Sequence, residues 1–157
     1  KEKFLKRCVE CGIDGIIVPD MPFEEKDELA DICEANGIDL ISMIAPTSED
    51  RIELIAREAK GFIYCVSSLG VTGIRENITT DIEKIVNKIR SVTDIPCAVG
   101  FGISTPKQAG EMARISDGVI VGSAIVKLVG EYGKNCIKPV SEYVKSMKKG
   151  IKDVCMV

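Results

Sequence analysis

The sequence predicts an α/β protein built on a parallel β-sheet. Five short apolar runs alternate with segments whose apolar residues recur at helical spacing, and this alternation is typical of parallel sheets with right-handed crossovers. The runs are too continuous for strands with one wet face, so we expect both faces of the sheet to be covered. Apolar residues make up 45% and charged residues 29% of the 157 residues, as in globular proteins.

The elements follow one another from the start of the chain. A charged amphipathic segment predicts a first helix, and each of the five expected strands is followed by a helix. The expected strands are residues 15–18, 39–44, 62–66, 97–101 and 118–121. The last helix is expected from about Lys138 onward.

Several expected helix boundaries carry end signals. Gly37 and Gly61 are typical of helix stops. The acidic residues of segment 47–50 favour a helix start, because they lie at the positive end of the helix dipole. Two further segments match the capping-box pattern at a helix start, the second with proline at the first helical position: residues 80–83 and 105–108.

The composition excludes several classes of function. The chain has no histidine, which removes His-based catalytic triads, His general bases and most catalytic zinc sites. With 21 basic and 24 acidic residues the net charge is −3, so we expect no basic face for nucleic acid. The longest apolar stretch, residues 118–126, is too short to cross a membrane.

Cysteine usage favours a reducing compartment. The seven cysteines are spread through expected core segments, which is typical of small buried hydrophobic side chains in a cytoplasmic protein. The one close pair, Cys8 and Cys11, has no second pair and no histidine to complete a metal site. We therefore expect no bound metal.

Glycine-bearing segments follow the last three expected strands, at residues 67–77, 100–104 and 122–124. A phosphate dianion is held by converging backbone N–H groups, which glycine exposes and a helix N-terminus supplements. Eight-stranded α/β barrels build such a pocket from the loops after strands seven and eight. This pattern favours part of a barrel, whereas the chain length alone favours an open, doubly wound sheet of five strands.

Three further residues lie where strand ends or a long loop place them near such a site. Asp20 ends the first expected strand and is compatible with an acid or base, a partner contact or a turn. Tyr64 is compatible with a hydroxyl that points into a cavity or with an ordinary core aromatic. Thr72 lies in a loop of about eleven residues that is long enough for a lid.

Taken together, these segments resemble the tryptophan synthase alpha subunit family. The matching stretches cover nearly the whole chain in order: residues 14–25, 44–47, 62–73, 100–106 and 121–126. The Ser-x-x-Gly-Val-Thr-Gly and Gly-Phe-Gly-Ile-Ser patterns among them are the most specific. One departure is Ser68, where the family often has arginine.

The resemblance implies a TIM (β/α)8 barrel that cleaves indole-3-glycerol phosphate to indole and glyceraldehyde 3-phosphate, a lyase step of tryptophan biosynthesis. It implies that the substrate phosphate is held by Gly73, Gly102, Gly122 and Ser123. It implies that the substrate pocket is lined by Ile17, Tyr64 and Phe101. Thr72 would belong to the lid, and Asp20 and Pro22 would approach a beta subunit. Pyridoxal phosphate would belong to that partner, so no cofactor is expected here.

The family's two catalytic carboxylates, a glutamate and an aspartate, belong to its second and third barrel strands or the adjoining loop. The resemblance implies that residues 1–157 are a single domain, a partial barrel of five parallel strand–helix units that supplies strands four to eight, with the N-terminal units absent. We therefore expect negligible lyase activity from this chain alone. Its open barrel edges would be completed by another segment or by self-association.

Two alternatives remain at this point. The first is another phosphate-binding barrel, such as a sugar-phosphate epimerase or a relative of thiamine phosphate synthase, which shares the phosphate loops without the Gly-Val-Thr-Gly segment. The second is a non-catalytic α/β binding module of five strands.

Overall fold

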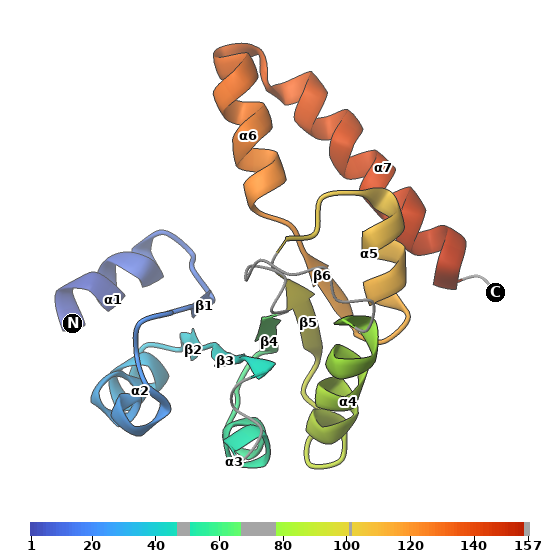
Figure 1. The fold of residues 1–157 in the computed structure, drawn as a ribbon. Coiled ribbons are helices and arrows are strands. Elements are labelled where there is room, and N and C mark those ends of the chain that lie inside the picture. Colours follow the sequence, from blue (N-terminus) through green and yellow to red (C-terminus); the bar gives the residue numbers. More distant parts are fainter. Residues whose placement is uncertain (47–50, 67–77, 101, 156–157) are drawn as a thin grey trace.

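The computed structural model describes residues 1–46, 51–66, 78–100 and 102–155. Figure 1 shows the arrangement of its helices and strands. The helices are α1 (Glu2–Glu10), α2 (Asp27–Ala35), α3 (Ile52–Arg57), α4 (Ile78–Arg90), α5 (Pro106–Ala113), α6 (Ser123–Tyr132) and α7 (Ile137–Cys155). The strands are β1 (Gly15–Ile16), β2 (Asp39–Leu40), β3 (Ser42–Ile44), β4 (Ile63–Val66), β5 (Cys97–Gly100) and β6 (Gly118–Ile120). Short 3₁₀ helices are η1 (Phe23–Glu25) and η3 (Gly133–Asn135).

All strand pairs are parallel and follow chain order. β1 pairs with β2, and β3, β4, β5 and β6 form one sheet in that sequence. β2 and β3 are two halves of one expected strand, joined at Ile41, whose N–H donates to the carbonyl of Ile16 at 2.9 Å. A doubly wound sheet reverses its strand order at a switch point. The unbroken order therefore confirms the predicted α/β class and favours the partial barrel.

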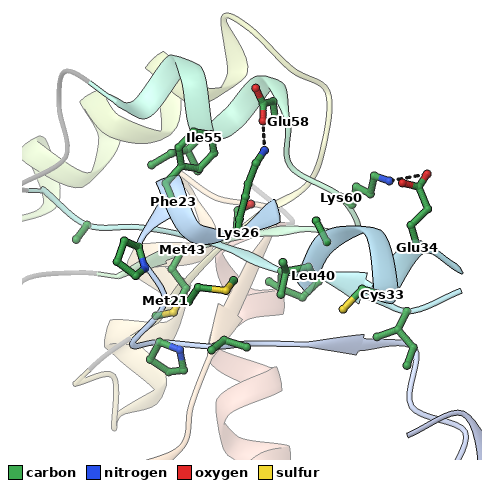
Figure 2. Close-up of a pocket in the computed structure, with 18 of the residues that line it drawn as sticks. Met21, Phe23, Lys26, Cys33, Glu34, Leu40, Met43, Ile55, Glu58 and Lys60 are labelled. Carbon is green, nitrogen blue, oxygen red and sulfur yellow. Dashed lines mark hydrogen bonds and ion pairs between the residues drawn. The ribbon is translucent and has the colours of Figure 1, made fainter. Parts of the chain in front are cut away.

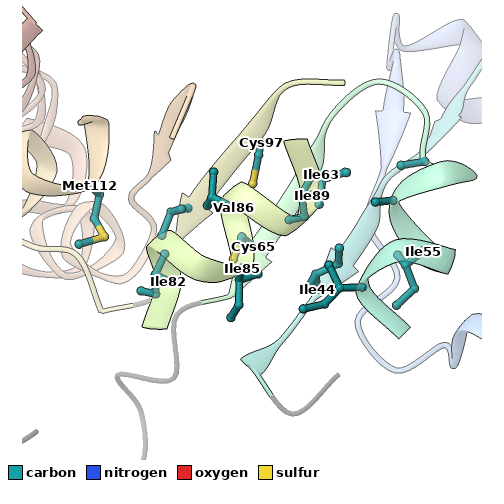
Figure 3. Close-up of a cluster of buried hydrophobic side chains, with 14 of the residues drawn as sticks. Ile44, Ile55, Ile63, Cys65, Ile82, Ile85, Val86, Ile89, Cys97 and Met112 are labelled. Carbon is teal, nitrogen blue, oxygen red and sulfur yellow. The ribbon is translucent and has the colours of Figure 1, made fainter. Parts of the chain in front are cut away.

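The main hydrophobic core lies on one face of this sheet, as Figure 3 shows. Strand residues of this face are buried against side chains from α3, α4 and α5. They are Ile44, Ile63, Cys65, Cys97 and Val99. A smaller cluster joins α1 and α2 to β1 and β2, with Leu5, Cys8, Cys33 and Ile38 at its centre. The helices that contribute to these two clusters therefore cover a single face.

The opposite face of the sheet is only half-buried, so the expectation that both faces are covered is wrong for the described residues. Successive side chains of a strand point to opposite faces, which places every second residue on the uncovered side. These are Met43, Tyr64, Val66, Ala98 and Ile120, all of intermediate exposure. We call this surface the inner face. In a closed barrel it would pack against the remaining strands.

The helix ends agree in part with the predicted signals. Gly37 follows α2 with φ of +66° and confirms its stop, whereas α3 ends at Arg57, before Gly61. The capping box at Thr105 is confirmed: its hydroxyl accepts the Gln108 N–H. The capping box predicted at Thr80 is wrong, because α4 already includes Ile78. The helix start predicted at residues 47–50 lies outside the described residues.

The described cysteines behave mainly as core residues. Cys8, Cys33, Cys65 and Cys97 are buried and unpaired by disulfides, whereas Cys11 is exposed. Contact with the Cys97 thiol and burial raise the pKa of Cys65, so its thiol stays protonated. Within the described ranges, no cluster of three or more cysteine or acidic side chains has the geometry to hold a metal ion. None of the described helices has the length and apolarity needed to cross a membrane.

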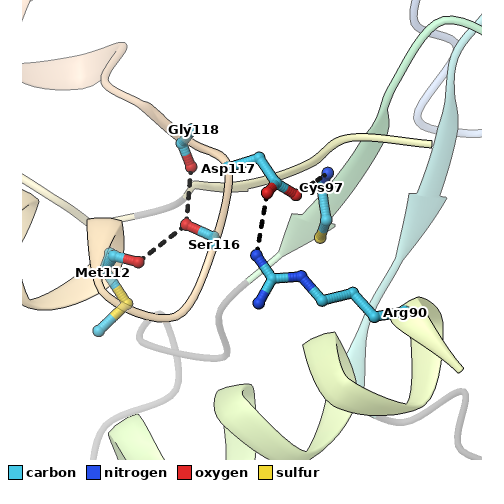
Figure 4. A network of polar contacts seen from close by, with 6 residues as sticks. All are labelled: Arg90, Cys97, Met112, Ser116, Asp117 and Gly118. Atoms are coloured by element: carbon cyan, nitrogen blue, oxygen red, sulfur yellow. Dashed lines mark hydrogen bonds and ion pairs between the residues drawn. The ribbon is translucent and has the colours of Figure 1, made fainter. Parts of the chain in front are cut away.

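A polar network fixes the ends of β5 and β6 that lie away from the glycine-bearing loops (Figure 4). The Asp117 carboxylate accepts the N–H of Cys97 at 2.9 Å and pairs with Arg90 of α4 at 2.9 Å. The Ser116 hydroxyl lies 2.8 Å from the Met112 carbonyl and 2.9 Å from the Gly118 carbonyl, and donates its proton to either. The network ties α4, β5 and β6 together at the edge opposite the candidate site.

Acid should weaken this network. The hydrogen bond from Cys97, followed by the pairing with Arg90, holds the pKa of Asp117 below its usual value. Its contribution to stability is therefore present above about pH 4, near the pKa of the unfolded chain, and is lost as the pH falls through the lower pKa of the folded protein. Asp117→Asn should lower the free energy of unfolding at pH 7 by roughly 1 kcal/mol, because its side chain is partly exposed.

Urea unfolding of the wild type and the Asn variant at pH 7 and at about pH 3 measures this effect. The two proteins should differ at pH 7 and converge in acid. Asp94→Asn is the matched control, since Asp94 is exposed and forms no ion pair within the described residues. A difference between wild type and Asp117→Asn that is unchanged in acid would contradict the assignment.

Candidate functional site

The ends of β5 and β6 bring two of the predicted glycines to one edge of the sheet. Gly100 of β5 is the register partner of Ile120 of β6. Gly102 and Gly122 each follow their strand by two residues, so they continue from neighbouring strand ends, which are about 5 Å apart in the pairing direction. This order suits a phosphate site, and the role of Gly102, Gly122 and Ser123 in it stays a prediction.

The N-terminus of α6 is left uncapped at this edge. Gly122 is its N-cap residue and supplies no side chain, so no side-chain hydrogen bond closes this helix end. The first intrahelical bonds run from the N–H groups of Ile125 and Val126 to the carbonyl of Gly122. The N–H groups of Ser123 and Ala124 in the first turn point out of the helix without such a partner. This helix end can accept an anion.

The neighbouring helix α5 is closed by its own side chains. The side-chain oxygen of Gln108 accepts the N–H groups of Ser104 at 3.0 Å and Thr105 at 3.1 Å. Because these donors are occupied, Gly102 and Ile103 are the described residues of the preceding loop whose N–H groups have no hydrogen bond to another described residue. Gly102 has a φ of +75°, a left-handed conformation that side chains disfavour. The two loops therefore contribute differently: β5 through its glycine turn, β6 through its open helix end.

Tyr64 lies on the inner face and its ring covers Gly100. A Cβ atom on Gly100 would lie 2.5 Å from Cε2 and 2.7 Å from the hydroxyl of Tyr64, and 2.9 Å from the Cβ of Ile120. Only glycine leaves the room that the ring occupies. Tyr64 is thus directed along β5 toward the strand tips, and its place in a substrate pocket stays a prediction.

Gly100→Ala should displace the Tyr64 ring and lower the free energy of unfolding by about 1–2 kcal/mol. Urea unfolding measures the loss, and the signals of the Tyr64 ring in NMR spectra report its displacement. Gly118→Ala is the control on the same face, since its Cβ would meet only Ala98 at an ordinary 3.4 Å. Combining Gly100→Ala with Tyr64→Leu should recover part of the loss; full additivity of the two changes would contradict the packing.

A cavity of about 570 Å³ lies between the tip of β1 and β3, against α2 and α3 (Figure 2). Its wall is mostly apolar, and two ion pairs lie at its border, Lys26 with Glu58 and Lys60 with Glu34. The apolar side chains that line it include Met21, Phe23, Leu40, Met43 and Ile55. Met43 and Val66 of the inner face also line the cavity. The cavity therefore reaches from the side of α2 and α3 to the inner face.

The other predicted residues fall in different places. Pro22 lines the cavity, whereas Asp20 is exposed in the turn before it and does not line it. Ile17 has 40% of its surface exposed and is likewise not part of the cavity wall, although Val18 is. The predicted site residues Gly73, Thr72 and Phe101, and the departure at Ser68, lie outside the described residues.

Sequence reasoning missed Met43 and Phe23, which the structure adds to the walls around the site. The alternation of residues 39–44 carried the signal for Met43, because every second residue of that strand faces away from Ile44. No local signal identified Phe23, whose partner Ile55 comes from a separate helix.

Comparison with known proteins points to one family. The family model described as tryptophan synthase alpha chain matches residues 1–153. A tryptophan synthase alpha chain of Lacticaseibacillus casei is 45% identical over 150 residues, which are 96% of this chain and 56% of the relative. The chain thus spans about half the length of the curated relatives it matches.

Solved structures show the same fold. The alpha subunit of tryptophan synthase from Campylobacter jejuni superposes with a TM-score of 0.78 at 36% identity, covering 98% of this chain and 58% of that one. A tryptophan synthase chain from M. tuberculosis in an aminoacrylate-bound form gives 0.79 at 26% identity, covering 96% and 55%. The predicted partial barrel is confirmed, and these matches favour neither of the two alternatives.

Proposed function

Because the chain belongs to the tryptophan synthase alpha chain family, we propose that it forms the phosphate-binding part of an indole-3-glycerol-phosphate lyase of tryptophan biosynthesis. The observation that carries this proposal is the uncapped N-terminus of α6 beside the glycine turn of β5. Gly102, Gly122 and Ser123 would hold the phosphate through backbone N–H groups, and Gly73 would add a donor from its loop.

The rest of the substrate would extend from this anchor along the inner face. Tyr64 is directed toward the strand tips by its packing on Gly100, and the apolar cavity beside Met43 offers room for a flat ring. We assign Ile17, Tyr64 and Phe101 to the wall of the substrate pocket and Thr72 to its lid. Fixing the phosphate at one end orients the bond to be cleaved relative to the catalytic groups.

The bond cleavage itself needs proton transfers, which carboxylates commonly provide. The described side chains of β3 to β6 on the inner face are Met43, Tyr64, Val66, Ala98 and Ile120, among which there is no carboxylate. General acid–base catalysis would protonate the indole ring carbon and take the glycerol hydroxyl proton. We assign these steps to a glutamate and an aspartate outside residues 1–157, and treat the 157 residues as a single domain that forms the C-terminal part of the barrel.

Two measurements on the purified chain test this assignment. Inorganic phosphate should shift the amide NMR signals of Gly102, Gly122 and Ser123, because they would contact the anion. Incubation with indole-3-glycerol phosphate should release no detectable indole, because the proposal places both catalytic carboxylates outside these residues. Phosphate-induced shifts confined to other surfaces would refute the phosphate site. Turnover by the chain alone would refute the assignment of the catalytic carboxylates to residues outside 1–157.

The partner assignments follow the same family relation. We propose that the turn at Asp20 and Pro22, which is exposed beside the cavity, contacts a beta subunit that carries pyridoxal phosphate, and that this chain needs no cofactor itself. The exposed edges of β1 and β6 also suit self-association. The buried thiols suit a reducing compartment, and we place the protein in the cytoplasm.

A further inference from the structure

The C-terminal helix α7 packs along α5, as Figure 1 shows, and reaches the loop that precedes it. The hydroxyl of Tyr143 on α7 donates a hydrogen bond of 2.9 Å to the carbonyl of Ser104. Gly150 of the same helix lies against the backbone of Pro106, with room for no side chain between them. One helix therefore contacts both the loop, at Ser104, and the first residue of α5, at Pro106.

The peptide groups around Ser104 are fixed from both sides. The side chain of Gln108 accepts the Ser104 N–H at 3.0 Å, while Tyr143 donates to the Ser104 carbonyl. The preceding side chain, Ile103, is only 4% exposed and anchored in the core. The peptide N–H groups of Gly102 and Ile103, which have no hydrogen bond within the described residues, lie directly before this fixed point. Their direction therefore depends on where Ser104 is held.

We infer that Tyr143 is a positioning residue of the phosphate site, acting through the Ser104 carbonyl on the N–H groups of Gly102 and Ile103. The inference rests on the proposed function. It adds to the phosphate site a residue that lies about forty positions after Ser104 in the chain, on a helix to which the proposal assigns no phosphate donor. Burial raises the pKa of Tyr143, so the hydroxyl remains a proton donor at neutral pH and above.

Tyr143→Phe tests this role, because it removes the hydroxyl and keeps the ring. Titration of the variant with inorganic phosphate, followed by amide NMR, should give a dissociation constant roughly threefold to tenfold higher than that of wild type, the range expected for one lost hydrogen bond. In the absence of phosphate the amide signals of Gly102 and Ile103 should already be shifted. Both readouts report on the loop rather than on global stability.

Tyr132→Phe is the matched control. The Tyr132 hydroxyl is exposed and makes no hydrogen bond within the described residues, so its loss should leave phosphate affinity and the Gly102 amide unchanged. Equal affinity of wild type and Tyr143→Phe, with unshifted Gly102 and Ile103 amides, would overturn the positioning role while the phosphate site stands. Absence of phosphate binding by wild type would overturn the proposed function and, with it, this inference.

Discussion

Gly122→Asp is expected to weaken phosphate binding at least tenfold while leaving the fold intact or slightly more stable. The size of the effect follows from the repulsion between two unit charges about 4 Å apart near a protein surface, which is roughly 4 kcal/mol before salt reduces it. A Cβ atom at Gly122 would meet nothing within 4 Å, so the side chain fits. The carboxylate would occupy the open helix end of α6 and compete with the substrate's dianion for the same N–H groups.

The effect on stability should have the opposite sign. Aspartate is a better N-cap than glycine by a few tenths of a kcal/mol and interacts favourably with the helix dipole. Thermal unfolding should therefore show an unchanged or slightly raised midpoint in the variant that loses phosphate affinity. This combination separates a lost binding site from a damaged protein.

Gly122→Asn isolates the contribution of charge, because asparagine has nearly the same shape and caps the helix without the negative charge. In isothermal titration with inorganic phosphate, wild type should have the highest affinity, Gly122→Asn a lower affinity and Gly122→Asp the lowest. Undiminished phosphate affinity in the aspartate variant would mean that the anion binds away from α6.

Gly150→Ala is expected to lower the free energy of unfolding by about 1–3 kcal/mol, although alanine is normally the better helix residue by about 1 kcal/mol. The added Cβ would lie 2.3 Å from the carbonyl oxygen and 2.8 Å from the carbonyl carbon of Pro106. Both are backbone atoms, so α7 and α5 must move apart. The loss measures how closely the two helices approach.

Gly130→Ala provides the control for helix propensity. Gly130 lies in α6, where a Cβ would meet nothing within 4 Å, so the change should stabilise the protein by up to about 1 kcal/mol. Urea unfolding of both variants gives the comparison. The dependence of the unfolding free energy on urea concentration should be unchanged if the folded state stays compact. A stabilising Gly150→Ala would show that the helices are not in contact at Pro106.

Local patterns were sufficient for much of the fold. The capping box at Thr105, the positive φ of Gly37 and the buried strand residues each depend on neighbours within a few positions in the chain. The same holds for Gly102 and Gly122, whose positions after apolar runs placed them at strand ends. The alternation of side chains along a strand also predicts that Met43 lies on the inner face, opposite Ile44.

Other features depended on partners far apart in sequence. The boundary signal at Thr80 was outweighed by a helix that already includes Ile78. The expectation of two covered sheet faces was wrong for the described residues, because the helices that build the two clusters pack on one side. The cavity beside Met43 is lined by residues of β1's following turn, α2, β3 and α3, so no run of neighbouring residues encodes it.

The sequence by itself determined the order of strands and helices, the family, and which glycines end the last strands, since these follow from local periodicity and short motifs. Only the tertiary structure decided that the loop before α5 is also held from α7, through the hydrogen bond that Tyr143 donates to the Ser104 carbonyl. It also decided that Tyr64 needs Gly100 and that Gly150 must lack a side chain. The physical reason is that these distances are set by packing between separate elements.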